Sequence, residues 1–336
     1  MRKKTQTIGW YSNDLIDQKK WIIYLNKSEL NLVKKILEKI TSNESKKEIT
    51  SLLFSKFTPI IHRIFDAAIN QYGFLIVKGF PIPNDNLNID VLSQFYLYFC
   101  QLIGVPLIQN KKGNLLFNIK TMNYTMTDPN GRGANHNNAL PLHADHGGLL
   151  GMYCLHTAEI GGHTLLGSTQ TIHDSIAAER LDLLKILYQP FYGDRRGQEP
   201  DGKLPYDINP IFKKYNDKLL CQYVGIYYYD AQIKFQDIPR MTQSQLDALN
   251  MFAKISAREE INFEVKLEPG DMIFINNNKV LHGRTTFLNK NIFQKTRHLL
   301  RIWLSTPQIK SFPHYYGHPI PSWIRIYDDN ASSCAT

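Results

Sequence analysis

Apolar residues follow a helical spacing in the first third of the chain. After Ser28, a residue type that often caps helices, they recur at Leu30, Leu32, Val33, Ile36, Leu37 and Ile40. A second helix is expected over about 49–71, and Gly73 separates it from an apolar strand at 74–77. A further helix is expected over about 91–102. The pattern therefore predicts a largely helical region around the first buried strand.

From about residue 115 the pattern changes to short apolar runs separated by Gly, Pro and Asn. The expected strands are 115–119, 149–156, 163–166, 208–212, 219–224, 261–267, 272–275 and 299–304. Two more helices are expected, over about 172–187 and 243–257. Many short strands joined by turns are typical of a β-sandwich or barrel. Neither GxGxxG nor GxxxxGK[ST] occurs, so the phosphate-cradling nucleotide folds lose support.

The composition is that of a globular protein. The chain has 336 residues, of which 43% are hydrophobic and 21% charged, and this excludes wholesale disorder, collagen and coiled coil. No apolar run is long enough to span a bilayer, and the basic N-terminus is not followed by the apolar core of a signal peptide. The four Cys show no CxxC spacing. We therefore expect a cytoplasmic protein without a disulfide framework or zinc ribbon.

The formal net charge of +9 has little predictive weight. The Lys and Arg residues are spread along the chain instead of forming a basic tract. Neither a nucleic-acid partner nor a membrane is therefore expected. The positive charge alone would favour one alternative hypothesis, a demethylase that acts on nucleic acid. The sequence makes no prediction of the oligomeric state.

The segment Leu142-His143-Ala144-Asp145-His146-Gly147-Gly148 carries the first candidate chemistry. Residues two apart on an extended chain point to the same face, so His143 and Asp145 place an imidazole beside a carboxylate. A distant histidine would complete a facial triad of two histidines and one carboxylate, which suits Fe(II) and leaves coordination positions open. A polar turn before the strand at Leu149 would produce the same HxD pair.

Residues 268–285 offer that distant histidine. Pro269-Gly270-Asp271 predicts a turn, which an apolar strand and an Asn-rich turn follow, and a short strand then ends at His282. A histidine at the end of a buried strand beside Gly283 is well placed as a ligand. A core histidine bonded to a backbone carbonyl would fit the same pattern.

A third segment, 297–304, contains two arginines in an otherwise apolar strand. Buried guanidinium groups are rare without an anionic partner. Arg297 and Arg301 therefore indicate either a dicarboxylate cosubstrate, held by charge-assisted contacts, or a pair of structural salt bridges.

Taken in this order, the motifs resemble those of the taurine dioxygenase-like (TauD/TfdA, clavaminate synthase-like) Fe(II)/2-oxoglutarate-dependent oxygenases. The resemblance covers roughly residues 74–305, and the intervening segment 190–197 also resembles the sequences of this family. It rests on four motifs, namely HxD, Gly161-Gly162-His163-Thr164, the PGD turn that leads to His282-Gly283-Arg284, and the strand that begins with Arg297, 15 residues after His282.

The resemblance implies roles for these residues. Arg297 would pair with the distal carboxylate of 2-oxoglutarate, and Thr164 would hydrogen-bond the same carboxylate. Arg301, on the same face of the strand as Arg297, would line the cosubstrate or the substrate side. The catalytic iron, with O2 as the oxidant, would be bound by His143, Asp145 and His282.

The family fold implies a mainly β chain with flanking helices, built around a double-stranded β-helix (jelly roll, cupin-like) core. The expected organisation is an N-terminal helical region (1–72) packed on the core, an oxygenase domain (73–305) with helical insertions, and an extended C-terminal tail (306–336).

The resemblance also implies a reaction. Related halogenases replace the carboxylate ligand with Ala or Gly, so the presence of Asp145 favours oxygen transfer or desaturation over halogenation. We expect hydroxylation of an unactivated C–H bond of a small polar metabolite, such as an amino acid or a natural-product intermediate, with decarboxylation of 2-oxoglutarate to succinate. Desaturation, cyclisation and C–heteroatom cleavage use the same cofactors and stay open, as does a cupin-type metal-binding protein that is not an oxygenase.

Candidate substrate contacts are fewer and weaker. The polar residues just before the metal motif are expected on a lid over the iron, although a surface loop explains most of them: Asn118, Asn123, Asn135, Asn137 and Asn138. His146 faces either the pocket or solvent. Arg195 and Arg196 form either a carboxylate clamp or a charged turn, and one ring of Tyr227–Tyr229 is a further candidate for the pocket.

Overall fold

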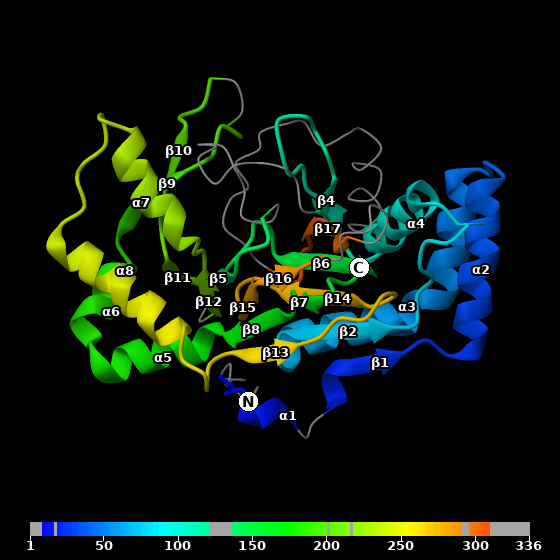
Figure 1. Cartoon of the computed structure of the whole chain (residues 1–336), viewed down its shortest axis with the longest axis horizontal. Helices are drawn as coiled ribbons and strands as arrows, with labels where there is room; N and C mark the ends of the chain where they lie inside the picture. The colour runs from blue at the N-terminus through cyan, green and yellow to red at the C-terminus, as the bar shows by residue number, and fades with distance from the viewer. Residues whose placement is uncertain are drawn as a thin grey trace, which may run out of the picture.

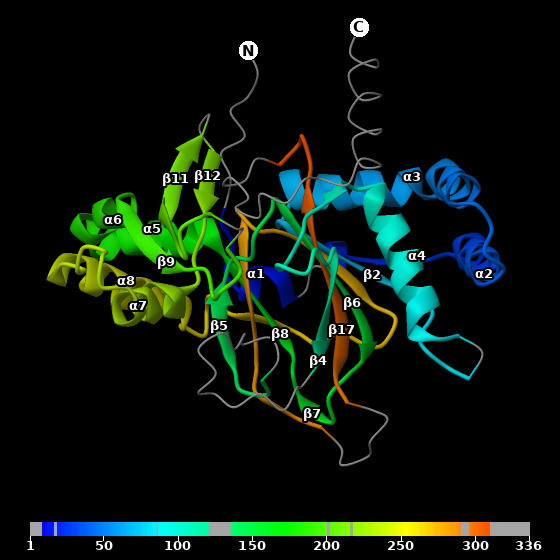
Figure 2. The ribbon, with the colours of Figure 1, turned by 90° about the horizontal axis from the view of Figure 1, so that it is seen from above.

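The computed structural model describes residues 9–16, 19–85, 87–120, 136–199, 202–215, 218–289 and 296–309. Two β-sheets lie at its centre, and helices pack on both sides of the pair (Figures 1 and 2). None of the described helices has the length and apolar character needed to cross a membrane.

The larger sheet has the order β1-β2-β14-β6-β17-β3, with β4 also paired to β17. All of its pairs are antiparallel except the parallel pair β1–β2. Its strands are β1 (Ile22–Tyr24), β2 (Phe74–Lys78), β3 (Val105–Pro106), β4 (Leu116–Lys120), β6 (Leu149–His156), β14 (Met272–Asn276) and β17 (His298–Ser305).

The smaller sheet has the order β13-β8-β15-β5, and all of its pairs are antiparallel. Its strands are β5 (Leu140–His143), β8 (Thr164–Ser168), β13 (Phe263–Val265) and β15 (Val280–Arg284). Three separate two-stranded ribbons are β7 (Ile160–Gly161) with β16 (Phe287–Leu288), β9 (Pro190–Asp194) with β10 (Tyr206–Pro210), and β11 (Phe212–Tyr215) with β12 (Lys218–Cys221).

Alternation along the strands divides the apolar side chains between two cores. On β2, Phe74 and Ile76 join a core shared by both sheets, whereas Leu75 and Val77 join a core shared with helices. Leu166 of β8 belongs to the shared core of the two sheets. Because side chains alternate between the faces of a strand, one face of β2 lies toward the opposite sheet and the other toward the helices.

Two groups of helices cover the sheets. One group packs on the larger sheet through α2 (Lys27–Thr41), α3 (Lys46–Asn70) and α4 (Ile89–Gln101). The other packs beside the smaller sheet and the ribbon β11–β12 through α5 (Thr169–Glu179), α6 (Leu181–Leu187), α7 (Gly225–Lys234) and α8 (Gln243–Ser256). Short helical turns near the N-terminus are α1 (Asn13–Ile16) and η1 (Lys19–Trp21).

Most predicted elements are confirmed, with instructive exceptions. The cap of α2 is Asn26, which forms a capping box with Glu29, so Ser28 lies inside the first turn. The helix expected over 172–187 is broken at Arg180, whose φ of −149° and ψ of 73° are not helical, although the apolar spacing continues across it. The expected strand 208–212 is likewise split between β10 and β11.

The prediction of a mainly β chain was too narrow, because helices and sheets both contribute largely to the described chain. Helix α7 was not predicted: its Tyr227-Tyr228-Tyr229 run has the aromatic character of a strand. The tail expected over 306–336 lies outside the described residues from position 310 onward.

Candidate metal centre and cosubstrate cavity

Strand register brings two of the predicted ligands together. His143 at the end of β5 is the direct partner of His282 on β15, and their ring centroids are 4.3 Å apart. Asp145 follows β5 by two residues, and its Oδ2 lies 3.5 Å from Nε2 of His282. One ligand atom from each of the three residues lies within 4.8 Å of the others. This donor set, with two imidazoles and one carboxylate, fits a metal such as Fe(II).

The local electrostatics prepare these groups as ligands. Burial, together with the nearby His282, lowers the pKa of His143 to about 4, so its imidazole is neutral at physiological pH. Nδ1 of His143 lies 2.9 Å from the carbonyl oxygen of Pro141, and it must carry the proton because a carbonyl only accepts. The lone pair of His143 is therefore on Nε2, the nitrogen left for a metal.

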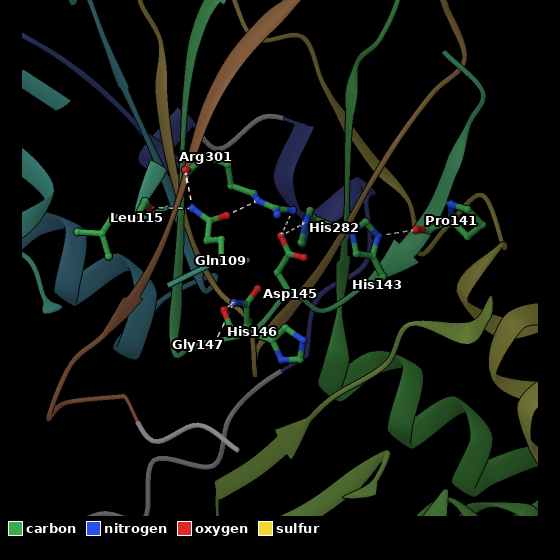
Figure 3. A network of polar contacts seen from close by, with 10 residues as sticks. Gln109, Leu115, Pro141, His143, Asp145, His146, Gly147, His282 and Arg301 are labelled. Carbon is green, nitrogen blue, oxygen red and sulfur yellow. Dashed lines mark hydrogen bonds and ion pairs between the residues drawn. The ribbon is translucent and has the colours of Figure 1, made fainter. Parts of the chain in front are cut away.

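Asp145 is kept ionised by a buried arginine. Burial alone would raise the pKa of Asp145, but Arg301 and then His282 hold it well below its ordinary value. Nη1 of Arg301 donates to Oδ2 of Asp145 over 2.9 Å, and both side chains are about nine-tenths buried. Figure 3 shows this pair between the two histidines and Gln109, whose Oε1 accepts from Nε of Arg301 over 2.9 Å.

Arg297 lies on the same face of the strand segment as Arg301 but in a different environment. It is 6% exposed and lines a cavity of about 240 Å³ together with Cys154, Leu267 and Leu299. Burial lowers its pKa to about 10. Among the described residues, no carboxylate forms an ion pair with its guanidinium, which packs over the ring of Phe287 at 5.3 Å. A buried cation in a cavity suits an anionic ligand.

Gly162, two residues before Thr164, leaves room for Arg297. A Cβ atom on Gly162 would lie 3.0 Å from Nε of Arg297, and the φ of Gly162 is +72°, a region that side chains disfavour. Thr164 itself is buried at the start of β8. It is the register partner of Arg284, which donates to the carbonyl oxygens of His136 and Asn138.

The sequence of residues 43–303 matches the family described as Taurine catabolism dioxygenase TauD, TfdA family. The chain belongs to the TauD/TfdA family. It is therefore an Fe(II)/2-oxoglutarate-dependent oxygenase, and its cofactors are Fe(II) and 2-oxoglutarate. This assignment contradicts the alternative of a cupin-type protein that is not an oxygenase.

Two proteins are similar to this chain in sequence. The FR-33289 synthase of Streptomyces rubellomurinus is 28% identical over 249 residues, which cover 72% of this chain and 71% of that protein. The taurine hydroxylase-like protein SAT17 of Stachybotrys chartarum is 33% identical over 174 residues, covering 50% of this chain and 43% of that protein.

Two solved oxygenases share the fold at low sequence identity. Asparagine oxygenase, in complex with Fe(II), (2S,3S)-3-hydroxyasparagine and succinate, is 12% identical with a TM-score of 0.63, covering 85% of this chain and 94% of its own. The non-haem iron oxygenase OrfP, in complex with Fe and α-ketoglutaric acid, is 14% identical with a TM-score of 0.60, covering 84% and 94%.

The described candidate substrate residues of this TauD/TfdA chain, His146, Arg195 and Arg196, all make contacts within the protein. The ring of His146 packs against Trp303, with centroids 5.1 Å apart. Arg196 forms an ion pair with Asp230 and packs over the ring of Tyr227, whereas Nη1 of Arg195 donates to the carbonyl oxygen of Leu204. These two arginines therefore already have partners within the protein.

The candidate lid residues are divided between described and undescribed parts of the chain. Asn123 and Asn135 lie outside the described residues. Oδ1 of Asn118 pairs with Nε2 of His298, while Asn137 and Asn138 contribute backbone carbonyls to Phe287 and Arg284. None of these described contacts assigns the asparagines to a substrate.

Sequence reasoning missed Gln109, Arg284 and Phe287. Gln109 carries no local signal, because it lies in an irregular segment between β3 and β4 and meets Arg301 across 192 positions. Arg284 was within the quoted HGR motif, and its spacing of two from His282 on a strand could have indicated a shared face.

Proposed function

We propose that this TauD/TfdA oxygenase hydroxylates an unactivated C–H bond of a small polar metabolite, an amino acid or a natural-product intermediate. Coupled decarboxylation would convert 2-oxoglutarate to succinate. We further propose that the two facing sheets form the double-stranded β-helix of the family. The observation that carries the proposal is the meeting of His143, Asp145 and His282, together with Arg297, which directly precedes β17, is buried, and has no ion-pairing carboxylate among the described residues.

The proposed iron ligands are His143, Asp145 and His282. Their chemistry fits, because both imidazoles lie in a largely buried site and Asp145 is ionised. Bound Fe(II) would supply the activation of O2 that C–H oxidation requires. The chain's own contribution is to fix the ligand orientations: Pro141 sets the tautomer of His143, and Arg301 anchors Asp145.

The proposed role of Arg297, with Thr164, is to bind the distal carboxylate of 2-oxoglutarate. Arg297 and Arg301 are four residues apart on one extended segment, which corresponds to about 13 Å between their Cα atoms. Arg301 contacts Asp145, one of the proposed iron ligands. Arg297 therefore lies on the same extended segment as Arg301 but about 13 Å away from it, measured between Cα atoms. In the proposal, one end of the five-carbon diacid is at the metal and the other is at Arg297.

The substrate class has support from relatives only. The names of the similar proteins mention asparagine, hydroxyarginine and an FR-33289 synthase. Asp145 occupies the carboxylate position, which favours hydroxylation or desaturation over halogenation. Desaturation, cyclisation and C–heteroatom cleavage would use the same residues.

The experiment that tests the proposal has two parts. Anaerobic addition of Fe(II) and 2-oxoglutarate should give a visible charge-transfer band, which Arg297→Gln should weaken and Arg258→Gln, a change in an ion pair on the protein surface, should not. A metabolite pool should then be screened for substrate-dependent succinate release and a mass gain of one oxygen. Absence of both the band and succinate would contradict the proposal, whereas loss of two hydrogens would indicate desaturation.

A further inference from the structure

The side chain of Gln109 is fully buried, and both the nitrogen and the oxygen of its amide form hydrogen bonds. It is 0% exposed, and its Nε2 donates to the carbonyl oxygens of Leu115 over 2.8 Å and of Arg301 over 2.9 Å. Its Oε1 accepts from Nε of Arg301 over 2.9 Å. A flipped amide would place its oxygen against two carbonyls and its nitrogen against a guanidinium, so only one orientation is compatible with these neighbours.

Arg301 has three kinds of contact around its guanidinium. The rings of Phe117 and Trp303 lie 5.1 Å and 4.7 Å from its central carbon, Nη1 donates to Asp145, and Nε donates to Gln109. Ring contacts attract a guanidinium but allow it to slide and rotate. The bond from Nε to Gln109 is directional, and together with the bond to Asp145 it fixes the rotation of the group.

The chain of contacts therefore runs from Gln109 through Arg301 to the carboxylate of Asp145 (Figure 3). A carboxylate that turns freely can present either or both oxygens to an ion, whereas a hydrogen-bonded one has a preferred orientation. The hydrogen bonds that join Gln109 to Arg301 and Arg301 to Asp145 give Gln109 a path to the carboxylate.

We propose that Gln109 is a positioning residue for the metal centre, which holds the guanidinium of Arg301 so that Arg301 fixes the carboxylate of Asp145. The inference rests on the proposed function, because it requires Asp145 to bind the metal. Removal of a group that hydrogen-bonds a metal ligand directly weakens metal binding by about 10- to 100-fold in other proteins. Gln109 acts one contact further out, through Arg301, so a loss of about 10-fold is expected when it can no longer accept from Arg301.

The test compares three replacements at this position. Gln109→Met keeps the volume but removes the acceptor, and Gln109→Asn keeps the amide but is too short to reach. Gln109→Glu keeps an acceptor for Arg301 and loses the two donated bonds. Gln101→Met is the matched control, because both amide atoms of Gln101 are buried and have no hydrogen-bond partner among the described residues.

Each variant is titrated anaerobically with Fe(II), and the unfolding temperature of the metal-free protein is measured in parallel. We expect Gln109→Met and Gln109→Asn to lose about 10-fold in Fe(II) affinity, the lower end of the range for a direct partner of a metal ligand. Gln109→Glu should lose stability but retain most of the affinity, and Gln101→Met should match the native protein in affinity. The charge-transfer band with 2-oxoglutarate should shift only where the affinity falls.

Two results would overturn the inference. One is native Fe(II) affinity in Gln109→Met and Gln109→Asn. The other is an affinity that falls in parallel with stability in all three variants, since that is the behaviour of a purely structural residue.

Asp145→Ala is included to separate the two proposals. If this variant binds Fe(II) normally, the proposed metal site is wrong. If it loses Fe(II) binding and the Gln109 variants do not, only the proposed role of Gln109 is wrong. If Gln109→Met does not fold, the Fe(II) affinities of Gln109→Asn and Gln109→Glu are compared instead, and equal affinities would contradict the inference.

Discussion

Arg297 and Arg301 lie four residues apart on the same face of one extended segment, yet the protein surrounds them differently. Arg301 is bonded to Asp145 and Gln109 and packs against two aromatic rings. Arg297 lines a cavity and, among the described residues, meets the ring of Phe287 without an ion-pairing carboxylate. The compensated arginine, Arg301, belongs to the internal structure of the proposed metal centre, and the uncompensated one, Arg297, is suited to a ligand that arrives from solution.

The largest effect is expected in the region around Arg301, from the loss of His282, whose ring lies beside Asp145. His282→Ala should remove Fe(II) binding and reduce succinate formation from 2-oxoglutarate to background, because one of three proposed ligands is gone. Anaerobic Fe(II) titration and a succinate assay measure this. His62→Ala, on the exposed side of α3, is the control, and Fe(II) binding by His282→Ala at native strength would show that the metal is held elsewhere.

Removing the compensated arginine should be costly for folding. Arg301→Leu leaves the buried carboxylate of Asp145 without its cation, and breaking such a pair costs about 3–5 kcal/mol in the free energy of unfolding. Urea denaturation of the metal-free protein measures the loss. Adding Asp145→Asn should restore part of it, and a loss below about 1 kcal/mol would place the pair in the range of surface ion pairs.

Removing the uncompensated arginine should act on the ligand instead. Arg297→Gln should weaken 2-oxoglutarate binding by roughly 30- to 1,000-fold, corresponding to about 2–4 kcal/mol for a buried charge contact. The metal-free protein should be no less stable than the native one, since burial already disfavours this cation. Equal stability losses in Arg297→Gln and Arg301→Leu would abolish the distinction between the two arginines.

The smallest effect concerns His298, the neighbour of Arg297 on the opposite face of the strand. Burial, with smaller contributions from Lys120 and His156, lowers its pKa to about 3 from an ordinary 6.5. The unfolded chain therefore takes up the proton first, so stability falls as the pH drops from about 6.5 toward 3. The loss from this group between pH 7 and 5 is up to about 2 kcal/mol. His298→Gln should flatten the dependence in urea denaturation series, and an unchanged slope would contradict the assignment.

Much of the fold was predictable because its signals are local. Strand β6 has the predicted bounds, and β14 and β17 differ from the predicted ones by a residue at one or both ends, because continuous apolar runs between turn residues define them. The break at Arg180 was not predictable in this way, since its apolar spacing continues through both helices α5 and α6. Helix α7 was missed because its three tyrosines favour a strand locally and become helical through packing on β9.

The sequence by itself determined which residue types carry the chemistry of the TauD/TfdA chain: an HxD pair, a later histidine and two arginines in an apolar strand. Only the tertiary structure decided which arginine is neutralised within the protein. Asp145 and Gln109 reach Arg301 across 156 and 192 positions, while Gly162 leaves space beside Arg297. Spacing along a strand fixes the face of a side chain, but its electrostatic partners come from other segments, and these are set by packing.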